Sequence, residues 1–182
     1  MATTSESDSA VRTAAGRRPF TALVLAGGFG TRLRSVLPDL PKTLAPVDGE
    51  PFLLRLLDQL VAAGAERLVL CTGHRGDRVA AAVGPRHADA EVVVSHEATP
   101  LGTAGALRHA LHLCGDDGVL VVNGDSYVDH DLASFVARAR AANRPTLLTV
   151  HVPDAARYGR VQLAPDQRVV RFVEKGDSGE GQ

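Results

Sequence analysis

The chain has 182 residues, of which 45% are hydrophobic and 23% are charged, as in an ordinary globular protein. Its formal net charge of −1 offers no basic surface, so we expect neither nucleic acid nor a membrane as a partner. No stretch has the apolar length of a signal peptide or a membrane span, and we therefore expect a cytoplasmic location.

Residues 1–19 are rich in Ser, Thr, Ala, Asp and Arg and contain no apolar run. Such a segment buries too little apolar surface to offset the loss of chain entropy, so we predict a disordered leader there. A single folded domain is predicted over residues 20–182. Its first element is a buried strand over the apolar run Thr21–Leu25.

The motif LAGGFGTRL occupies residues 25–33, where this strand ends, and Pro41-Lys42 follows. Glycines at a strand end allow backbone N–H groups to approach phosphate oxygens closely. Arg32 and Lys42 bring two cations to the same place, and phosphoryl chemistry requires such neutralisation of charge. The alternative interpretation is a tight strand-to-helix turn that carries two solvated cations.

Two common phosphate-binding loops do not fit this motif. A P-loop that starts at Gly27 would need glycine where Arg32 stands. The dinucleotide fingerprint G-x-G-x-x-G starts at Gly28 and Gly30 but meets Leu33 at its third glycine. The loop therefore belongs to another class.

The remaining chain alternates between helical and extended patterns. Apolar spacing predicts helices over 51–63, 75–83 and 132–142, and one that opens within 95–105 and places Leu107, Ala110, Leu111 and Cys114 on one face. Apolar runs predict strands over 67–71, 91–94, 118–122, 146–152, 159–163 and 169–173. This order predicts an α/β fold with a mostly parallel sheet covered on both faces, as in Rossmann-like proteins. Ligands bind such sheets outside the carboxyl ends of the strands.

Asp125 ends the most apolar predicted strand, in the run Val121–Asp125. A carboxylate there suits Mg²⁺, which takes one or two protein carboxylates together with substrate phosphates and water. The alternative is a turn residue in an Asn-Gly-Asp bend. Because the glycine loop also follows a strand, we expect it to face the same crevice as Asp125, although about ninety residues separate them in the sequence.

Other candidate groups are interpreted as structural. The histidines show no converging metal spacing, and Asp131 is predicted to cap the helix over 132–142. Cys71 and Cys114 each lie in an apolar stretch without the spacing of a metal pair. We predict that both are buried free thiols.

The glycine motif with Pro41-Lys42 resembles the signature of sugar-1-phosphate nucleotidyltransferases. With residues 100–103 (PLGT), 123–125 (NGD) and 172–176 (FVEKG), the resemblance extends over Thr21–Gly176. It is strongest to heptose-1-phosphate guanylyltransferases, with mannose-1-phosphate guanylyltransferases as near neighbours. Thr43 departs from the pattern, because these relatives commonly have proline or alanine after the lysine.

The resemblance implies a three-layer GT-A-like fold that transfers a nucleoside monophosphate, GMP in the favoured case, from a triphosphate to a sugar 1-phosphate. It implies Mg²⁺ as cofactor and is compatible with a homo-oligomer. Relatives continue for some tens of residues beyond the EKG step, to a second metal-binding aspartate, so the domain is expected to be truncated at its C-terminal end. A nucleotide-binding fragment without activity is therefore the alternative function.

The resemblance also implies roles for individual residues. Arg32, Lys42 and Asp125 would act in catalysis, with Asp125 holding the metal. Glu97 would accept hydrogen bonds from guanine N1–H and the exocyclic amine, unless it is merely a solvated residue at a strand end. The nucleotide-binding set is Ala26, Gly27, Gly28, Gly30, Thr31, Arg32, Glu97, Gly102 and Thr103. The sugar-phosphate set is Asn123, Gly159, Glu174 and Lys175.

Overall fold

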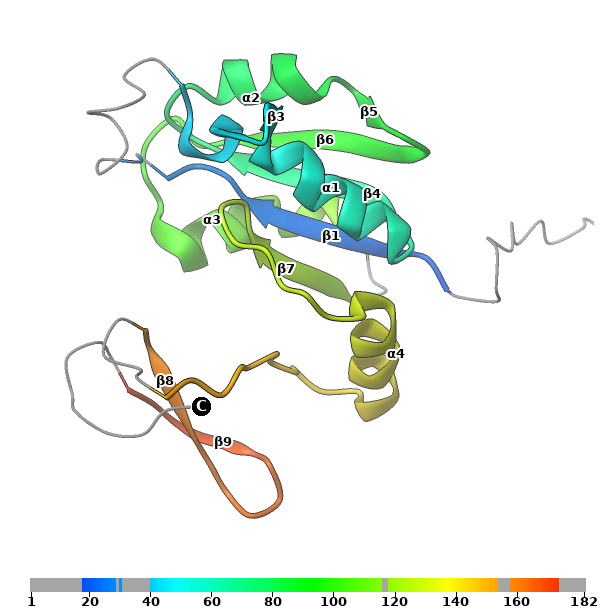
Figure 1. Ribbon diagram of the computed structural model, residues 1–182, viewed down its shortest axis with the longest axis vertical. Coiled ribbons are helices and arrows are strands. Elements are labelled where there is room, and N and C mark those ends of the chain that lie inside the picture. Colours follow the sequence, from blue (N-terminus) through cyan, green and yellow to red (C-terminus); the bar gives the residue numbers. More distant parts are fainter. Residues whose placement is uncertain (1–17, 29, 31–39, 116–117, 154–157, 174–182) are drawn as a thin grey trace, which may run out of the picture. The chain divides into compact units, whose positions relative to one another are not determined.

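The computed structural model describes residues 18–28, 30, 40–115, 118–153 and 158–173 (Figure 1). Contacts divide the chain into two compact units, residues 1–140 and residues 141–182, and each is described by itself. The predicted leader up to residue 17 and four predicted site residues lie outside the described part of the chain. These site residues are Thr31, Arg32, Glu174 and Lys175.

The first unit is built on a five-stranded sheet in the order β5-β6-β4-β1-β7 (Figure 1). All neighbouring pairs are parallel except β5 with β6, which is antiparallel. The strands are β1 (Phe20–Leu25), β4 (Ala65–Thr72), β5 (Arg86–His87), β6 (Ala90–His96) and β7 (Val119–Asn123). The predicted mostly parallel sheet is confirmed.

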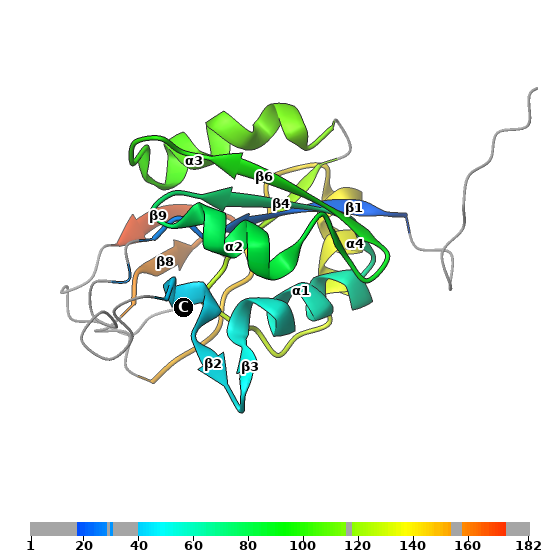
Figure 2. The same ribbon diagram turned by 90° about the horizontal axis from the view of Figure 1, so that it is seen from above.

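Helices cover both faces of this sheet, which confirms the predicted three-layer α/β architecture. Figure 2 shows α1 and α2 on one face and α3 on the opposite face. In the described part of the chain the α-helices are α1 (Phe52–Ala62), α2 (Gly76–Val83), α3 (Gly102–Ala110) and α4 (Leu132–Ala142). None of the helices among the described residues has the length and apolar character needed to cross a membrane.

Local sequence explains where these helices begin and end. In α1, leucines at positions 53, 56, 57 and 60 recur at helical spacing and are buried against the sheet. Gly64 follows the helix at a φ of 104°, a conformation that a side chain would strain. At the start of α4, Asp131 Oδ1 accepts a hydrogen bond from the Ser134 amide at 3.1 Å, so the predicted cap is confirmed.

Helix α3 ends earlier than its apolar pattern predicts. The chain passes from Ala110 into a 3₁₀ turn, η2 (Leu111–Leu113), and Leu111 is 54% exposed instead of facing inward. Two side chains of the sheet hold the carbonyls that follow: Arg67 donates to Leu113 O at 3.1 Å, and Thr21 Oγ1 donates to Cys114 O at 3.0 Å. These bonds satisfy carbonyls that a regular helix end would leave without partners.

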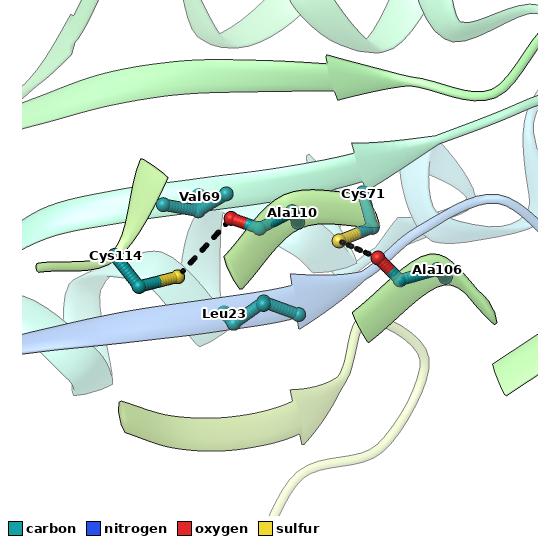
Figure 3. Packing of buried hydrophobic residues seen from close by; sticks show 6 residues of the cluster. All are labelled: Leu23, Val69, Cys71, Ala106, Ala110 and Cys114. Carbon is teal, nitrogen blue, oxygen red and sulfur yellow. Dashed lines mark hydrogen bonds between the residues drawn. The ribbon is translucent and has the colours of Figure 1, made fainter. Parts of the chain in front are cut away.

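The core beneath α3 is formed by small side chains (Figure 3). Ala106 and Ala110 allow the helix backbone to approach Leu23 and Val69, and two thiols fill the remaining space. Cys71 Sγ lies 3.9 Å from Ala106 O, and Cys114 Sγ lies 3.5 Å from Ala110 O. Both cysteines are buried and free, as predicted. Burial raises the pKa of the Cys71 thiol to about 11, with smaller contributions from Glu97 and Cys114.

The second unit contains the two predicted strands β8 (Arg160–Leu163) and β9 (Val169–Val173), and the structure pairs them antiparallel as a hairpin. The predicted strand over 146–152 is wrong, because only an isolated bridge at Val152 forms there. Leu147 and Val150 are 53% and 72% exposed. A strand requires a neighbour for its backbone groups, and within the described part of this unit residues 146–151 pair with none.

Candidate active site

A pocket of about 470 Å³ opens at the carboxyl edge of the parallel sheet in the first unit. Residues that follow β1, β4, β6 and β7 line it, as expected for ligand sites in sheets of this kind. Eight residues predicted from the sequence meet here: Gly27, Gly28, Lys42, Glu97, Gly102, Thr103, Asn123 and Asp125.

The strand order explains why the glycine loop and Asp125 meet. From β1 the chain moves outward on one side through β4 and β6, and it then crosses to β7 on the other side. Leu25 is paired in register with Asn123, and the Gly124 amide donates to Leu25 O at 2.9 Å. The expected crevice therefore lies at the switch point between β1 and β7.

Glycines at this edge are explained by close contacts as well as by access for a ligand. A Cβ on Gly27 would lie 3.2 Å from the Gly73 nitrogen, and one on Gly73 would lie 3.2 Å from Gly27 O. The loops after β1 and β4 therefore touch through their backbones. A Cβ on Gly28, by contrast, would meet nothing within 4 Å, so that position is open.

Two further glycines set the positions of the charged residues. Gly30 has a φ of 56°, and a Cβ there would lie 3.0 Å from Lys42 Cβ. A Cβ on Gly124 would lie 3.0 Å from Leu25 O, 3.1 Å from Thr43 Cγ2 and 3.3 Å from a methyl group of Val24. Asp125 thus directly follows a glycine that packs against the end of β1, and Lys42 packs against the backbone of Gly30.

We expect Gly124→Ala to lower the free energy of unfolding by about 1–3 kcal/mol, because a backbone oxygen and two side chains already fill the space. Chemical denaturation monitored by circular dichroism measures this change. Gly28→Ala is the matched control and should leave stability almost unchanged, since its Cβ has open space. Equal stability of the two variants would contradict the close packing of Gly124.

Lys42 and Asp125 form an ion pair across the pocket. Lys42 Nζ lies 2.6 Å from Asp125 Oδ2, and the two side chains are 43% and 36% exposed. Lys42 comes from the 3₁₀ turn η1 (Lys42–Leu44), and Asp125 follows β7, so 83 residues separate them. The other carboxylate oxygen, Oδ1, accepts a longer hydrogen bond of 3.3 Å from Ser126 Oγ.

Glu97 lies at the opposite side of the same edge, after β6. Its Oε2 accepts a hydrogen bond from the Leu101 amide at 3.0 Å, so the carboxylate closes the loop that leads into α3. Gly102 and Thr103, the first residues of α3, also line the pocket. A carboxylate at this helix N-terminus is favourable for the helix dipole.

Three other predicted residues do not line this pocket. The Ala26 side chain is buried, and its amide donates to Cys71 O at 2.8 Å. Gly30 contacts Lys42, as described above, and does not line the pocket. Gly159 belongs to the second unit, where it contributes to a separate, mainly apolar pocket with Leu147 and Phe172.

Sequence reasoning missed several residues that line the pocket. Gly73 and His74 follow β4, so the rule that sites lie at strand ends was sufficient to find them. Cys71 and Thr43 are buried and carry no signal of this kind in the sequence. The raised pKa keeps the Cys71 thiol neutral at physiological pH and therefore a poor nucleophile.

Comparison with known proteins now places the chain in a family. The sequence profile described as nucleotidyl transferase matches residues 21–181, which is most of the chain. The chain belongs to the nucleotidyl transferase family. Its pocket therefore lies in the fold of a known class of enzymes.

Two curated relatives in this nucleotidyl transferase family share substantial identity with the chain. D-glycero-alpha-D-manno-heptose 1-phosphate guanylyltransferase of Aneurinibacillus thermoaerophilus is 35% identical over 161 residues, which are 88% of this chain and 70% of that protein. The protein of the same name from Campylobacter jejuni is 30% identical over 85% of this chain and 68% of its own length.

A solved structure shows the same fold. HddC from Yersinia pseudotuberculosis, determined in complex with GMP-PN, is 33% identical and superposes with a TM-score of 0.72. The match covers 89% of this chain and 72% of that one. This nucleotidyl transferase thus shares its fold and a third of its aligned residues with a protein whose structure was determined in complex with GMP-PN.

Proposed function

We propose that the chain is a sugar-1-phosphate guanylyltransferase that acts on a sugar of the heptose or mannose type. A phosphate oxygen of the sugar 1-phosphate attacks the α-phosphorus of GTP, the bond to the β-phosphate breaks, and pyrophosphate leaves. The main support is the meeting of Gly27 and Gly28 with Lys42 and Asp125 in one pocket at the switch point. The relatives named for guanylyl transfer support the choice of base.

The order of the strands supports an orientation for the nucleotide. Glu97 follows β6 and Asp125 follows β7, and two strands, β4 and β1, lie between them. Three strand spacings correspond to roughly 14 Å, which is on the scale of an extended nucleotide. We therefore place the base beside Glu97 and Gly102, and the phosphates beside Lys42 and Asp125.

The proposed chemistry needs alignment and neutralisation of charge. The sugar phosphate is ionised at neutral pH, so its oxygen attacks without a strong general base. Lys42 would hold a phosphate oxygen as a point charge, and Asn123 would contact the sugar phosphate. Arg32, Thr31, Glu174 and Lys175 keep their proposed roles from the sequence, as does Gly159 in the second unit.

The donor groups in the pocket fit Mg²⁺ as the proposed cofactor. Among the described residues, no three His, Cys, Asp or Glu side chains gather to form a complete metal site. Asp125 offers a partly exposed carboxylate in the pocket that Asn123 also lines, which suits an ion that takes its other ligands from phosphates and water. When bound, the ion would neutralise charge on the phosphates.

The decisive experiment incubates the purified chain with Mg²⁺, each of four nucleoside triphosphates and a panel of sugar 1-phosphates, and follows pyrophosphate release. We expect turnover with GTP and with a heptose or mannose 1-phosphate. Thermal stabilisation by nucleotide without turnover would support the nucleotide-binding fragment instead. Neither response with any triphosphate would contradict both proposals.

We expect Glu97→Gln to reduce the preference for GTP over ATP about tenfold. The amide still accepts from the Leu101 N–H, but it no longer offers a charged acceptor to guanine, and such bonds contribute about 1.5–3 kcal/mol. The measurement is kcat/KM for each nucleotide. Glu66→Gln is the control, because this exposed glutamate lies at the other end of β4, away from the pocket. An unchanged preference would remove Glu97 from base recognition.

A further inference from the structure

The ion pair between Lys42 and Asp125 joins two groups that the proposed function assigns to different ligands. Lys42 is assigned to phosphate and Asp125 to the metal, yet Lys42 Nζ and Asp125 Oδ2 lie 2.6 Å apart. Both side chains line the pocket. Without ligands, each group is therefore the partner of the other.

The backbone on both sides of this pair is held in place. The turn that carries Lys42 is closed by two hydrogen bonds, Leu44 N to Pro41 O at 2.9 Å and Ala45 N to Lys42 O at 3.1 Å. Asp125 follows Gly124, which is bonded to and packed against Leu25 O. The two backbones therefore remain in reach of each other, while the lysine side chain has four rotatable carbon–carbon bonds that can carry Nζ to another partner.

Partial exposure makes this pair exchangeable. The lysine and aspartate side chains are 43% and 36% exposed, and water and salt weaken ion pairs of this kind. The multiply charged phosphate chain of a nucleotide competes well for the lysine. A divalent cation competes in the same way for the carboxylate.

We propose that Lys42 is an internal counter-ion that occupies Asp125 until a divalent cation and a phosphate ligand arrive together. Lys42 Nζ then moves from Asp125 Oδ2 to a phosphate oxygen, and the carboxylate turns to the cation. Either ligand alone leaves one charge of the pair without its partner, so each ligand strengthens binding of the other. This inference rests on the proposed function, since it uses the same pocket and the same ligands.

The first test measures Mn²⁺ affinity without nucleotide, from the paramagnetic resonance signal of the free ion. Lys42→Met removes the competitor, so we expect it to bind Mn²⁺ at least about fivefold more tightly than the unaltered chain. Lys42→Arg keeps the charge and should bind Mn²⁺ as weakly as the unaltered chain. Arg108→Met, on the exposed face of α3, controls for the loss of a distant charge. Equal Mn²⁺ affinity in the methionine variant and the unaltered chain would overturn the proposal.

The second test measures the coupling between the two ligands. Calorimetry gives the affinity for α,β-methylene-GTP with and without Mg²⁺, and we expect the gain from Mg²⁺ to be smaller in Lys42→Met than in the unaltered chain. An equal gain in both proteins would contradict the exchange. Because these are binding measurements, they stand apart from turnover: a chain without transferase activity that still shows the exchange would retain this inference and lose the proposed function.

The third test observes the unaltered chain by nuclear magnetic resonance, and a substituted chain serves only to assign the signals. The chain has two lysines, Lys42 and Lys175, so carbon-13 labelling of lysine Cε gives two signals, and Lys42→Arg identifies one of them. We expect the Lys42 signal to shift strongly when Mg²⁺ and α,β-methylene-GTP are added together, and weakly with Mg²⁺ alone. A signal that stays unchanged with both ligands would show that Lys42 remains on Asp125, and the proposal would fail.

Discussion

Asp125→Asn is expected to lower kcat/KM for guanylyl transfer by about a hundredfold or more and to remove most of the effect of Mg²⁺ on nucleotide binding. The amide keeps the shape of the side chain but loses the charge that the proposed metal requires. It also loses the charge that pairs with Lys42 Nζ at 2.6 Å. Steady-state rates and nucleotide titrations at several Mg²⁺ concentrations measure both effects.

The variant should fold normally, because a half-exposed ion pair stabilises a protein by only about 0.2–1 kcal/mol. Asp129→Asn is the matched control, since it removes the same charge from an exposed position four residues along the same loop. Asp129 does not line the pocket. If Asp125→Asn bound nucleotide and Mg²⁺ as the unaltered chain does, Asp125 would be a turn residue only.

Arg32→Ala is expected to lower kcat by about a hundredfold or more with little change in the free energy of unfolding. Under the proposed function this guanidinium neutralises charge that develops on the triphosphate in the transition state. The basis is the GGFGTRL motif, because Arg32 lies outside the residues that the structure describes. Rates at saturating GTP and sugar 1-phosphate give the change in kcat.

The comparison for this variant is Arg108→Ala. Arg108 is an exposed arginine on α3, and it does not line the pocket. Its loss should leave kcat within about twofold of the unaltered chain, which separates loss of a specific contact from loss of positive charge in general. Near-normal kcat in Arg32→Ala would exclude this residue from the catalytic step.

Glu97 has two separate roles to be tested, its hydrogen bond to the loop before α3 and its proposed contact with the base. The Leu101 amide already uses Oε2, so truncation to alanine would disturb the loop before α3 as well as the base contact. Glutamine keeps the first interaction and alters the second. The structure therefore changes how the base preference is best tested, although the preference itself is still a proposal.

The alternation of short apolar runs with amphipathic helices was sufficient to predict four strands of the sheet in the first unit, β1, β4, β6 and β7, but not the two-residue strand β5. Strands that are buried on both faces must be nearly continuous in Val, Leu and Ala, and the runs at β1 and β4 have this composition. The run at β7 is equally apolar, although β7 stands at the end of the strand order and Val121 is 44% exposed. The same alternation, with the rule that ligands bind at strand ends, predicted that the glycine loop and Asp125 share a crevice. These properties follow from local pattern and from the limited ways in which such patterns pack.

Tertiary structure decided the features that depend on contacts between distant segments. The run 146–152 has the composition of a strand but forms none, because a strand also requires a paired neighbour. Helix α3 gives way to a 3₁₀ turn at Leu111, and Arg67 and Thr21 of the sheet donate hydrogen bonds to the carbonyls that end this turn and follow it. Apolar spacing contains no information about such partners.

Within the pocket, the sequence by itself determined which residue types stand at the ends of β1 and β7. Only the tertiary structure showed that Gly27 packs against Gly73 and that Lys42 reaches Asp125. These contacts arise between loops that are joined by no local pattern, and their geometry depends on how the strands that carry them are ordered and registered. The ion pair of Lys42 with Asp125 and the close contact of Gly27 with Gly73 therefore follow from the folded sheet and not from the local sequence.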